Sequence, residues 1–344
     1  MKDTLTDANF PRTADARVYH LGLCPGEVAN RIVTVGSHSR ARTLQGLLDA
    51  KPEPFILASE RGFLTITGRY KNVPISIVSI GMGYPNMDFF VREVRECLLG
   101  DMVVIRLGSC GALVDVPVGT IVVPKASVMV VRNVDYDFVN SESSEKPPYL
   151  ISKLVSADPA LHTQVSEALD AAKGPSLRSG VLRNVVNASA DSFYSSQGRQ
   201  TSFPDHNADL IERLKATVPD LATFEMETFH LFHLAACWAG RNGTNGDVPP
   251  PLTERPAEHA VLQDTRARFK PLTGLANPDS VIRAAATLIV FAARNSREFI
   301  TPEEVQQAER LAGTGILNAL IKVEIPDHRL HPEKASVWGY HDSV

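Results

Sequence analysis

The chain has 344 residues, 44% of them hydrophobic and 22% charged, and a formal net charge of −4. This composition is that of an ordinary globular protein, and the charge gives no reason to expect a nucleic acid or an acidic membrane as partner. Its four cysteines, Cys24, Cys97, Cys110 and Cys237, form no C-x-x-C pair. They indicate neither a disulfide framework nor a zinc site, so we expect a cytoplasmic protein. The longest apolar stretch, near 284–293, is too short to span a bilayer.

Short apolar runs alternate with helix-like segments along the first two thirds of the chain. The runs are rich in Val and Ile and end in Gly, Pro or Ser, which predicts buried strands at 31–36, 74–81, 102–108, 120–131 and 180–188. Helices are expected between several of them, at 39–48, 88–99 and 159–172. The alternation predicts an α/β fold in one domain, with a mixed, largely buried central sheet flanked by helices.

The last third begins with a predicted helix after Glu227 and continues into a Pro- and Gly-rich insertion at about 238–280. The apolar run near 284–293 then resumes the sheet. Thr301-Pro302-Glu303-Glu304 supplies an N-cap, a first-turn proline and early acids for a closing helix to about Lys322. We expect an extended C-terminal tail at about 324–344.

Three arginines lie in or near the ends of predicted strands. Arg40 follows a strand and Gly36, Arg106 lies within an apolar run, and Arg294 closes another. A buried guanidinium costs several kcal/mol unless a carboxylate or an anionic ligand meets it. Ligands gather at such strand ends in open α/β sheets. Each arginine taken alone is equally well explained by a structural acid.

Two glycine-rich turns follow predicted strands. Gly108-Ser109-Cys110-Gly111 offers backbone N–H groups and a hydroxyl suited to phosphate oxygens, although a tight turn without a ligand is the commoner explanation of such a sequence. Gly81-Met82-Gly83 is followed by Tyr84-Pro85 where a dinucleotide fingerprint needs a third glycine, which excludes that motif.

The sequence resembles the uridine phosphorylases of the nucleoside phosphorylase family, with matching segments in the same order from about Val18 to Ile321 apart from the insertion. These segments are YHLGL (19–23), VGSHSR (35–40), ASERGF (58–63), SIGMGYP (79–85), RLGSCGAL (106–113), ASADSFYSSQGR (188–199) and FEMET (224–228). The Gln197-Gly198-Arg199 segment is similar to the pyrimidine-specific branch of the family.

The resemblance implies a role for each matched position. It assigns phosphate binding to Gly36, Arg40, Arg61, Arg106 and Ser109, with Arg61 reaching across from a neighbouring subunit. Ribose binding falls to His20 of the partner subunit and to Ser109, Glu225, Met226 and Glu227, and base binding to Phe193, Gln197, Arg199 and Arg294. The catalytic residues would be Arg40, Arg106, Arg199 and Glu227.

No cofactor is implied, because inorganic phosphate is a co-substrate. Gly62 stands where some bacterial relatives have a glutamate that binds a monovalent cation, which argues against a potassium site. Glu227, His230 and His233 have helical spacing, but a di-metal site needs a second Glu-x-x-His helix. We therefore expect no metal.

The activity implied by the resemblance is the reversible phosphorolysis of uridine to uracil and ribose 1-phosphate in pyrimidine salvage, with deoxyuridine and thymidine as further candidate substrates. The implied assembly is a homodimer at least, with a hexamer as the larger alternative. A purine nucleoside phosphorylase, a nucleoside hydrolase and a non-catalytic nucleoside-binding or storage protein are the competing hypotheses.

Overall fold

The computed structural model describes residues 4–172, 180–240 and 280–339. The helices are α1 (His38–Gln45), α2 (Tyr84–Cys97), α3 (Pro159–Ala172), α4 (Leu210–Thr217), α5 (Thr228–Gly240) and α6 (Pro302–Lys322). The strands are β1 (Leu5–Thr6), β2 (Arg12–Thr13), β3 (Arg31–Val35), β4 (Phe55–Ala58), β5 (Leu64–Tyr70), β6 (Val73–Ser79), β7 (Met102–Ala112), β8 (Ile121–Arg132), β9 (Tyr149–Ile151), β10 (Val155–Ser156), β11 (Val181–Ala190), β12 (Leu221–Glu225), β13 (Ile282–Ala293) and β14 (Glu298–Phe299). Short 3₁₀ turns cover Ser141–Ser143, Ser195–Gln197 and Asp327–Arg329.

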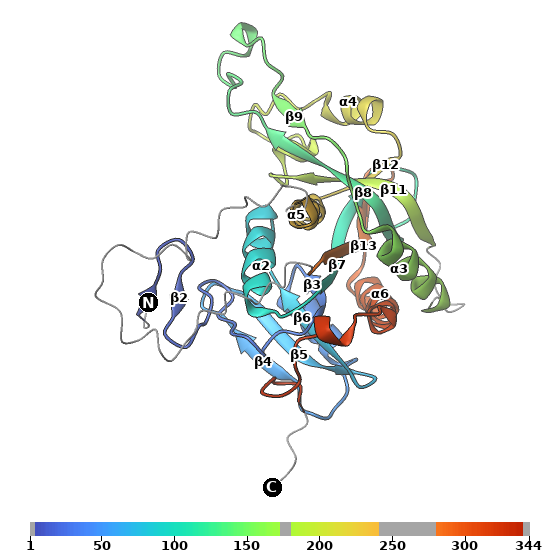
Figure 1. The fold of residues 1–344 in the computed structure, drawn as a ribbon. Coiled ribbons are helices and arrows are strands. Elements are labelled where there is room, and N and C mark those ends of the chain that lie inside the picture. Colours follow the sequence, from blue (N-terminus) through green and yellow to red (C-terminus); the bar gives the residue numbers. More distant parts are fainter. Residues whose placement is uncertain (1–3, 173–179, 241–279, 340–344) are drawn as a thin grey trace.

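The strands of these described ranges build one large mixed sheet of 12 strands, and β1 and β2 form a separate pair (Figure 1). β7 is parallel to β3 and β13 and antiparallel to β12. β13 also pairs with β8, β8 with β11, and β11 with β12. Because β12 pairs with β7, these strands form a closed ring of pairings. The predicted mixed α/β fold is confirmed.

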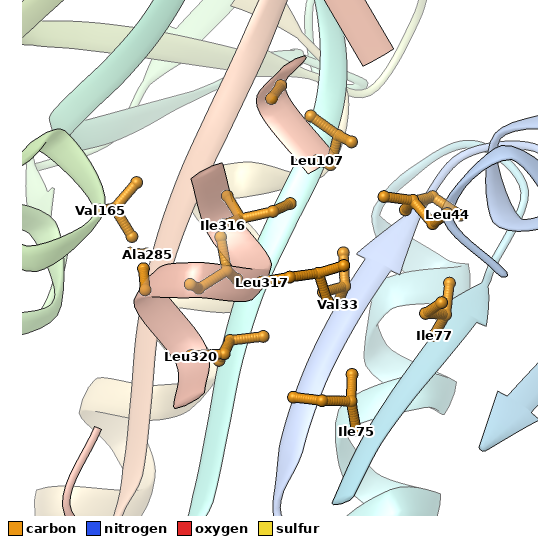
Figure 2. Packing of buried hydrophobic residues seen from close by; sticks show 14 of the residues in the cluster. Val33, Leu44, Ile75, Ile77, Leu107, Val165, Ala285, Ile316, Leu317 and Leu320 are labelled. Atoms are coloured by element: carbon orange, nitrogen blue, oxygen red, sulfur yellow. The ribbon is translucent and has the colours of Figure 1, made fainter. Parts of the chain in front are cut away.

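Helices cover both faces of the sheet. On one face α1, α3 and α6 contribute Leu44, Val165 and Ile316 to a core that also holds Val33 of β3 (Figure 2). On the other face residues of α2 and α5 share a second hydrophobic core with the neighbouring residue of the same strand, Ile32. Because successive strand residues point to opposite faces, a near-continuous apolar strand such as β3 supplies both cores. None of the described helices is long and apolar enough to cross a membrane.

The predicted helices are present with shifted ends. α2 begins at Tyr84, four residues before the expected start, because Gly83 at φ 92° ends the preceding loop and proline follows in the first turn. α6 begins at the predicted cap, where Thr301 and Glu304 form a capping box. α5 continues through Gly240, and residues 241–279 of the expected insertion lie outside the described residues.

The segment after α6 differs from the extended tail that the sequence predicts. Its described part, 324–339, folds back onto the body of the protein, and Trp338 is only 1% exposed. The Trp338 carbonyl accepts a hydrogen bond from Arg69 Nε at 3.0 Å, and Val337 N–H donates to the Gly26 carbonyl at 2.9 Å. A large buried aromatic side chain anchors this segment, which the local sequence pattern does not reveal.

Candidate active site

A cavity of about 350 Å³ opens where β3, β7, β12 and β13 end. Most of the residues singled out from the sequence line it, namely Gly36, Arg40, Arg106, Ser109, Phe193, Gln197, Arg199, Glu225, Met226 and Glu227. Pairing in the sheet explains the convergence, since β7 lies beside β3, β12 and β13 and carries Arg106 and Ser109 between them. Three other predicted site residues, His20, Arg61 and Arg294, are not among the described residues that line this cavity.

Arg106 stands at the centre of the cavity wall and joins two buried carboxylates. Its Nε donates to Glu225 at 3.4 Å and its Nη2 donates to Glu227, while the arginine itself is 3% exposed. A side chain at Gly108 would place its Cβ 3.2 Å from Arg106 Nε and 2.9 Å from Leu288, so glycine lets the guanidinium fold across the strand. Arg106 Nη1 is buried and has no hydrogen-bond partner among the described residues. Pairing with the two carboxylates therefore leaves one N–H of this guanidinium unsatisfied within the described residues.

Glu225 is fixed from several sides. It accepts hydrogen bonds from Asn187 Nδ2 at 2.8 Å, from the Ser189 hydroxyl and from the backbone N–H groups of Glu227 and Thr228. Burial would raise its pKa, but Arg106 and these donors outweigh burial and lower it. The sequence analysis assigns no role to Asn187 or Ser189. The feature that could have identified them is a pair of polar side chains on alternate residues of a buried strand, β11.

Glu227 is the more easily protonated of the two carboxylates. Its second oxygen accepts the N–H of Gly83 at 2.5 Å, at the start of α2. Burial and the adjacent charge of Glu225 nevertheless raise the pKa of Glu227 to about 7, against the opposing charge of Arg106. The sequence analysis does not predict the Gly83 contact either, because a hydrogen bond from a backbone N–H does not depend on the pattern of side chains.

Arg40 occupies the neighbouring part of the wall, in the first turn of α1. Ser37 caps this helix and accepts the Arg40 backbone N–H at 3.3 Å. The guanidinium donates through Nε to Glu309 of α6 at 2.7 Å and through Nη1 to the Leu107 carbonyl at 3.2 Å. Burial lowers the pKa of Arg40. Glu309 is not among the predicted site residues. In the sequence, a single acidic residue on an amphipathic helix cannot be distinguished from one on the solvent-exposed face.

The 193–199 loop forms another part of the cavity wall, through Phe193, Gln197 and Arg199. Gln197 is 2% exposed, and its side-chain oxygen accepts a hydrogen bond from Arg199 Nη1, which also donates to the Phe193 carbonyl at 2.6 Å. The Arg199 guanidinium lies 3.8 Å from the centre of the Phe193 ring. Burial, and next the charge of Arg294, lower the pKa of Arg199 to about 10. Arg294 donates to the backbone carbonyls of Gln197 and Gly198, so it supports this loop from outside the cavity wall.

His20 and Arg61 lie together around Tyr19 and are not part of the cavity lining. Arg61 donates to the Tyr19 hydroxyl, with its guanidinium 4.8 Å from the centre of the Tyr19 ring. His20 packs edge-on against Tyr19 at 4.8 Å and binds Glu93 through Nδ1 at 2.6 Å. The structure therefore brings together the two residues that the resemblance assigns to a neighbouring subunit's site.

The histidines that follow Glu227 have other contacts. His230 Nε2 lies 3.1 Å from Asp88 Oδ1, and the His233 ring stacks on Phe229 at 5.6 Å. Within the described ranges no group of three or more His, Cys, Asp or Glu side chains is placed to hold a metal ion.

Comparison with known proteins identifies the family to which the chain belongs. A sequence model described as the phosphorylase superfamily matches residues 30–238. The chain belongs to this superfamily. The matched region contains nearly all of the cavity wall except the residues contributed by β13 and β14.

Two relatives extend the match beyond a single segment. A uridine phosphorylase of Thermococcus kodakarensis is 29% identical over 248 residues, which cover 71% of this chain and 80% of that protein. A solved structure from a study of two uridine phosphorylases of the oomycete Phytophthora capsici is 35% identical, with a TM-score of 0.76, and covers 94% of this chain and 100% of the other.

Two further matches say less about activity, one because it is short and the other because its identity is low. A DeoD-type purine nucleoside phosphorylase of Geobacillus kaustophilus is 36% identical over only 95 residues, or 27% of this chain and 39% of that protein. A Trypanosoma brucei nucleoside phosphorylase, at 19% identity and a TM-score of 0.67, shares the fold.

Proposed function

We propose that this protein is a uridine phosphorylase, a pentosyltransferase that converts uridine and phosphate reversibly into uracil and ribose 1-phosphate. The observation that carries the proposal is the pairing of Gln197 with Arg199 in the wall of the same cavity that Arg40 and Arg106 line. A single cavity thus offers polar groups for a uracil ring and cationic groups for a phosphate. The Thermococcus kodakarensis uridine phosphorylase, matched over 80% of its length, and the structure from the study of Phytophthora capsici uridine phosphorylases support the same activity.

The proposed reaction breaks the bond between C1′ and N1 and forms a bond from C1′ to a phosphate oxygen. Arg40 and Arg106 hold the phosphate beneath C1′, together with the Ser109 hydroxyl and the backbone at Gly36. Glu227 accepts from the ribose hydroxyls, next to Met226, and its negative charge favours the positive charge that develops on the sugar. The electron pair leaves with uracil, where Arg199 and Gln197 stabilise the anion.

Phosphate dependence of uridine cleavage tests this proposal. Purified protein should release uracil and form ribose 1-phosphate only when inorganic phosphate is present. Uracil release that is independent of phosphate would indicate a hydrolase, preferential cleavage of inosine would indicate a purine enzyme, and nucleoside binding without cleavage would indicate a storage protein. Deoxyuridine and thymidine belong in the same assay, because the loss of the 2′-hydroxyl removes one of the groups that Glu227 would bind and the rates would show how much that contact matters.

The cysteines fit the expected cytoplasmic location. All four are unpaired, as is usual in a compartment that keeps thiols reduced. We retain this location as part of the proposal.

We further propose that the active unit is at least a dimer. Arg61 is exposed and lies with His20 on a surface outside its own cavity, so both are available to an adjacent subunit. The phosphate end of one chain also needs another cation, because its two arginines are paired with the carboxylates of Glu225, Glu227 and Glu309. An arginine from the partner would balance a dianion there.

Complementation between inactive variants measures this sharing. Arg61→Ala and Arg106→Ala chains, mixed and re-annealed, should recover roughly a quarter of wild-type activity, because random pairing gives one intact site in each mixed dimer. Arg40→Ala mixed with Arg106→Ala is the matched control and should recover nothing, since both residues act in their own chain. An absence of recovery with Arg61→Ala, despite demonstrated subunit exchange, would place Arg61 in its own site.

A further inference from the structure

A buried carboxylate on the closing helix contacts the phosphate end of the cavity without lining it. Glu309 of α6 is 7% exposed and lies 269 residues along the chain from Arg40, whose Nε it binds at 2.7 Å. Arg40 is itself 5% exposed and lines the cavity. Glu309 therefore contacts a ligand in the cavity only indirectly, through Arg40.

Three elements fix the plane of the Arg40 guanidinium. Glu309 of α6 binds Nε, the Leu107 carbonyl of β7 accepts from Nη1, and the Phe291 ring of β13 lies 5.5 Å from the guanidinium carbon. Among the described residues Nη2 donates no hydrogen bond, and Phe291 lines the same cavity as Arg40. The edge of the guanidinium that carries Nη2 is left to a ligand.

Holding α6 in place does not require Glu309. Ile316, Leu317 and Leu320 anchor the helix, because they are 0% exposed in the hydrophobic core that α6 shares with β3 and α3 (Figure 2). The capping box at Thr301 stabilises its first turn. A buried ion pair is also often no more stabilising than apolar residues of similar volume. The clear consequence of the pair is the orientation of Arg40.

We propose that Glu309 is a positioning residue for phosphate use, which holds Arg40 so that its free edge meets the phosphate. The proposal rests on the function proposed above. Orientation is what the contact adds, because the charge of Glu309 by itself repels a dianion. A neutral acceptor at this position should therefore preserve phosphate use, and a neutral side chain without an acceptor should not.

Glu309→Gln and Glu309→Met separate orientation from charge. Both are neutral and similar in volume, but only glutamine can accept the Arg40 Nε–H. We expect the Gln variant to keep a phosphate KM at or below that of the wild type, and the Met variant to show a kcat/KM for phosphate about tenfold lower than the Gln variant, in line with the loss of one hydrogen bond to a charged group. The KM for uridine should stay unchanged in both, because Glu309 has no contact with the 193–199 loop.

Thermal unfolding with and without inorganic phosphate provides a second readout that needs no turnover. The stabilisation by phosphate should be smaller for Glu309→Met than for Glu309→Gln. Glu303→Gln, at an exposed position on the same helix, is the control and should match the wild type. If the Met chain fails to fold, Glu309→Asp replaces it, because its shortened side chain withdraws the acceptor and should raise the phosphate KM.

Equal phosphate kinetics and equal phosphate stabilisation in folded Gln and Met variants would overturn the proposal and leave Glu309 a purely structural partner. Failure of the function itself looks different. Wild-type protein that is stabilised by phosphate but does not cleave uridine would contradict the proposed activity, while the comparison of phosphate stabilisation in the two variants would still decide the role of Glu309.

Discussion

Arg106→Ala should lower kcat/KM for phosphate by at least about a hundredfold, the usual effect of losing a preorganised charge-stabilising donor. Arg106 lines the cavity and holds both buried carboxylates, Glu225 and Glu227. Its loss removes a phosphate contact and at the same time adds uncompensated negative charge beside the phosphate. Steady-state kinetics with phosphate as the varied substrate measures the effect.

The same substitution should also destabilise the protein. Breaking a buried ion pair by removing one partner costs about 3–5 kcal/mol, because the remaining charge is left unpaired. Arg283→Ala is the matched control: Arg283 pairs with Asp158 at the start of β13 and lies outside the cavity wall. We expect this control to lose some stability and to keep normal phosphate kinetics. Normal phosphate kinetics in folded Arg106→Ala would contradict both the site and the proposed function.

Cytidine should be phosphorolysed about 10⁴-fold less efficiently than uridine, the discrimination that a buried polar site reaches when its groups are left mispaired. Uracil presents an N3–H donor between two carbonyl acceptors, which the Gln197 oxygen and the N–H groups of Gln197 and Arg199 can match. Cytosine presents a bare N3 and a 4-amino group. If the glutamine amide rotated to suit it, Arg199 would still face a donor, because a guanidinium cannot accept.

Gln197→Ala tests which residue provides this selectivity. The uridine KM should rise and kcat should fall together, because the contact serves both recognition of the base and stabilisation of the departing anion. Gln164→Ala is the control, since Gln164 of α3 donates to the Ala319 carbonyl on the helical layer and does not line the cavity. Comparable cleavage of cytidine, or of inosine, by the wild-type protein would show that Gln197 and Arg199 do not form a uracil-binding pair.

Purine nucleosides should fail for a steric reason as well. Their fused ring needs space that Phe193 and Gln197 occupy at the end of a cavity of about 350 Å³. The match to a purine enzyme is short and covers only 27% of this chain, so it gives little support to a purine substrate.

The local sequence was sufficient to predict the helices and strands whose formation depends on residues adjacent in the chain. The near-continuous apolar runs predict the buried strands, and the Thr301-Pro302 start predicts α6, because side-chain period and capping are properties of adjacent residues. The shifted start of α2 shows the limit of this approach: Gly83 at positive φ, and not the hydrophobic pattern, sets the first turn. The Trp338 anchor shows the same limit at the C-terminal end, since burial of one aromatic side chain depends on a surface formed by distant residues.

For the site, the sequence by itself determined which chemical groups are present: arginines in or next to buried strands, the Gln197-Gly198-Arg199 segment and the Glu225–Glu227 pair. Only the tertiary structure decided how they are connected. It pairs Arg40 with Glu309, places both carboxylates on Arg106, turns Arg294 to the backbone of the 193–199 loop and gathers His20 with Arg61 on another surface. Such contacts join residues far apart in the chain through strand pairing and helix packing, and the energy of a buried charge depends on these partners, which no local pattern encodes.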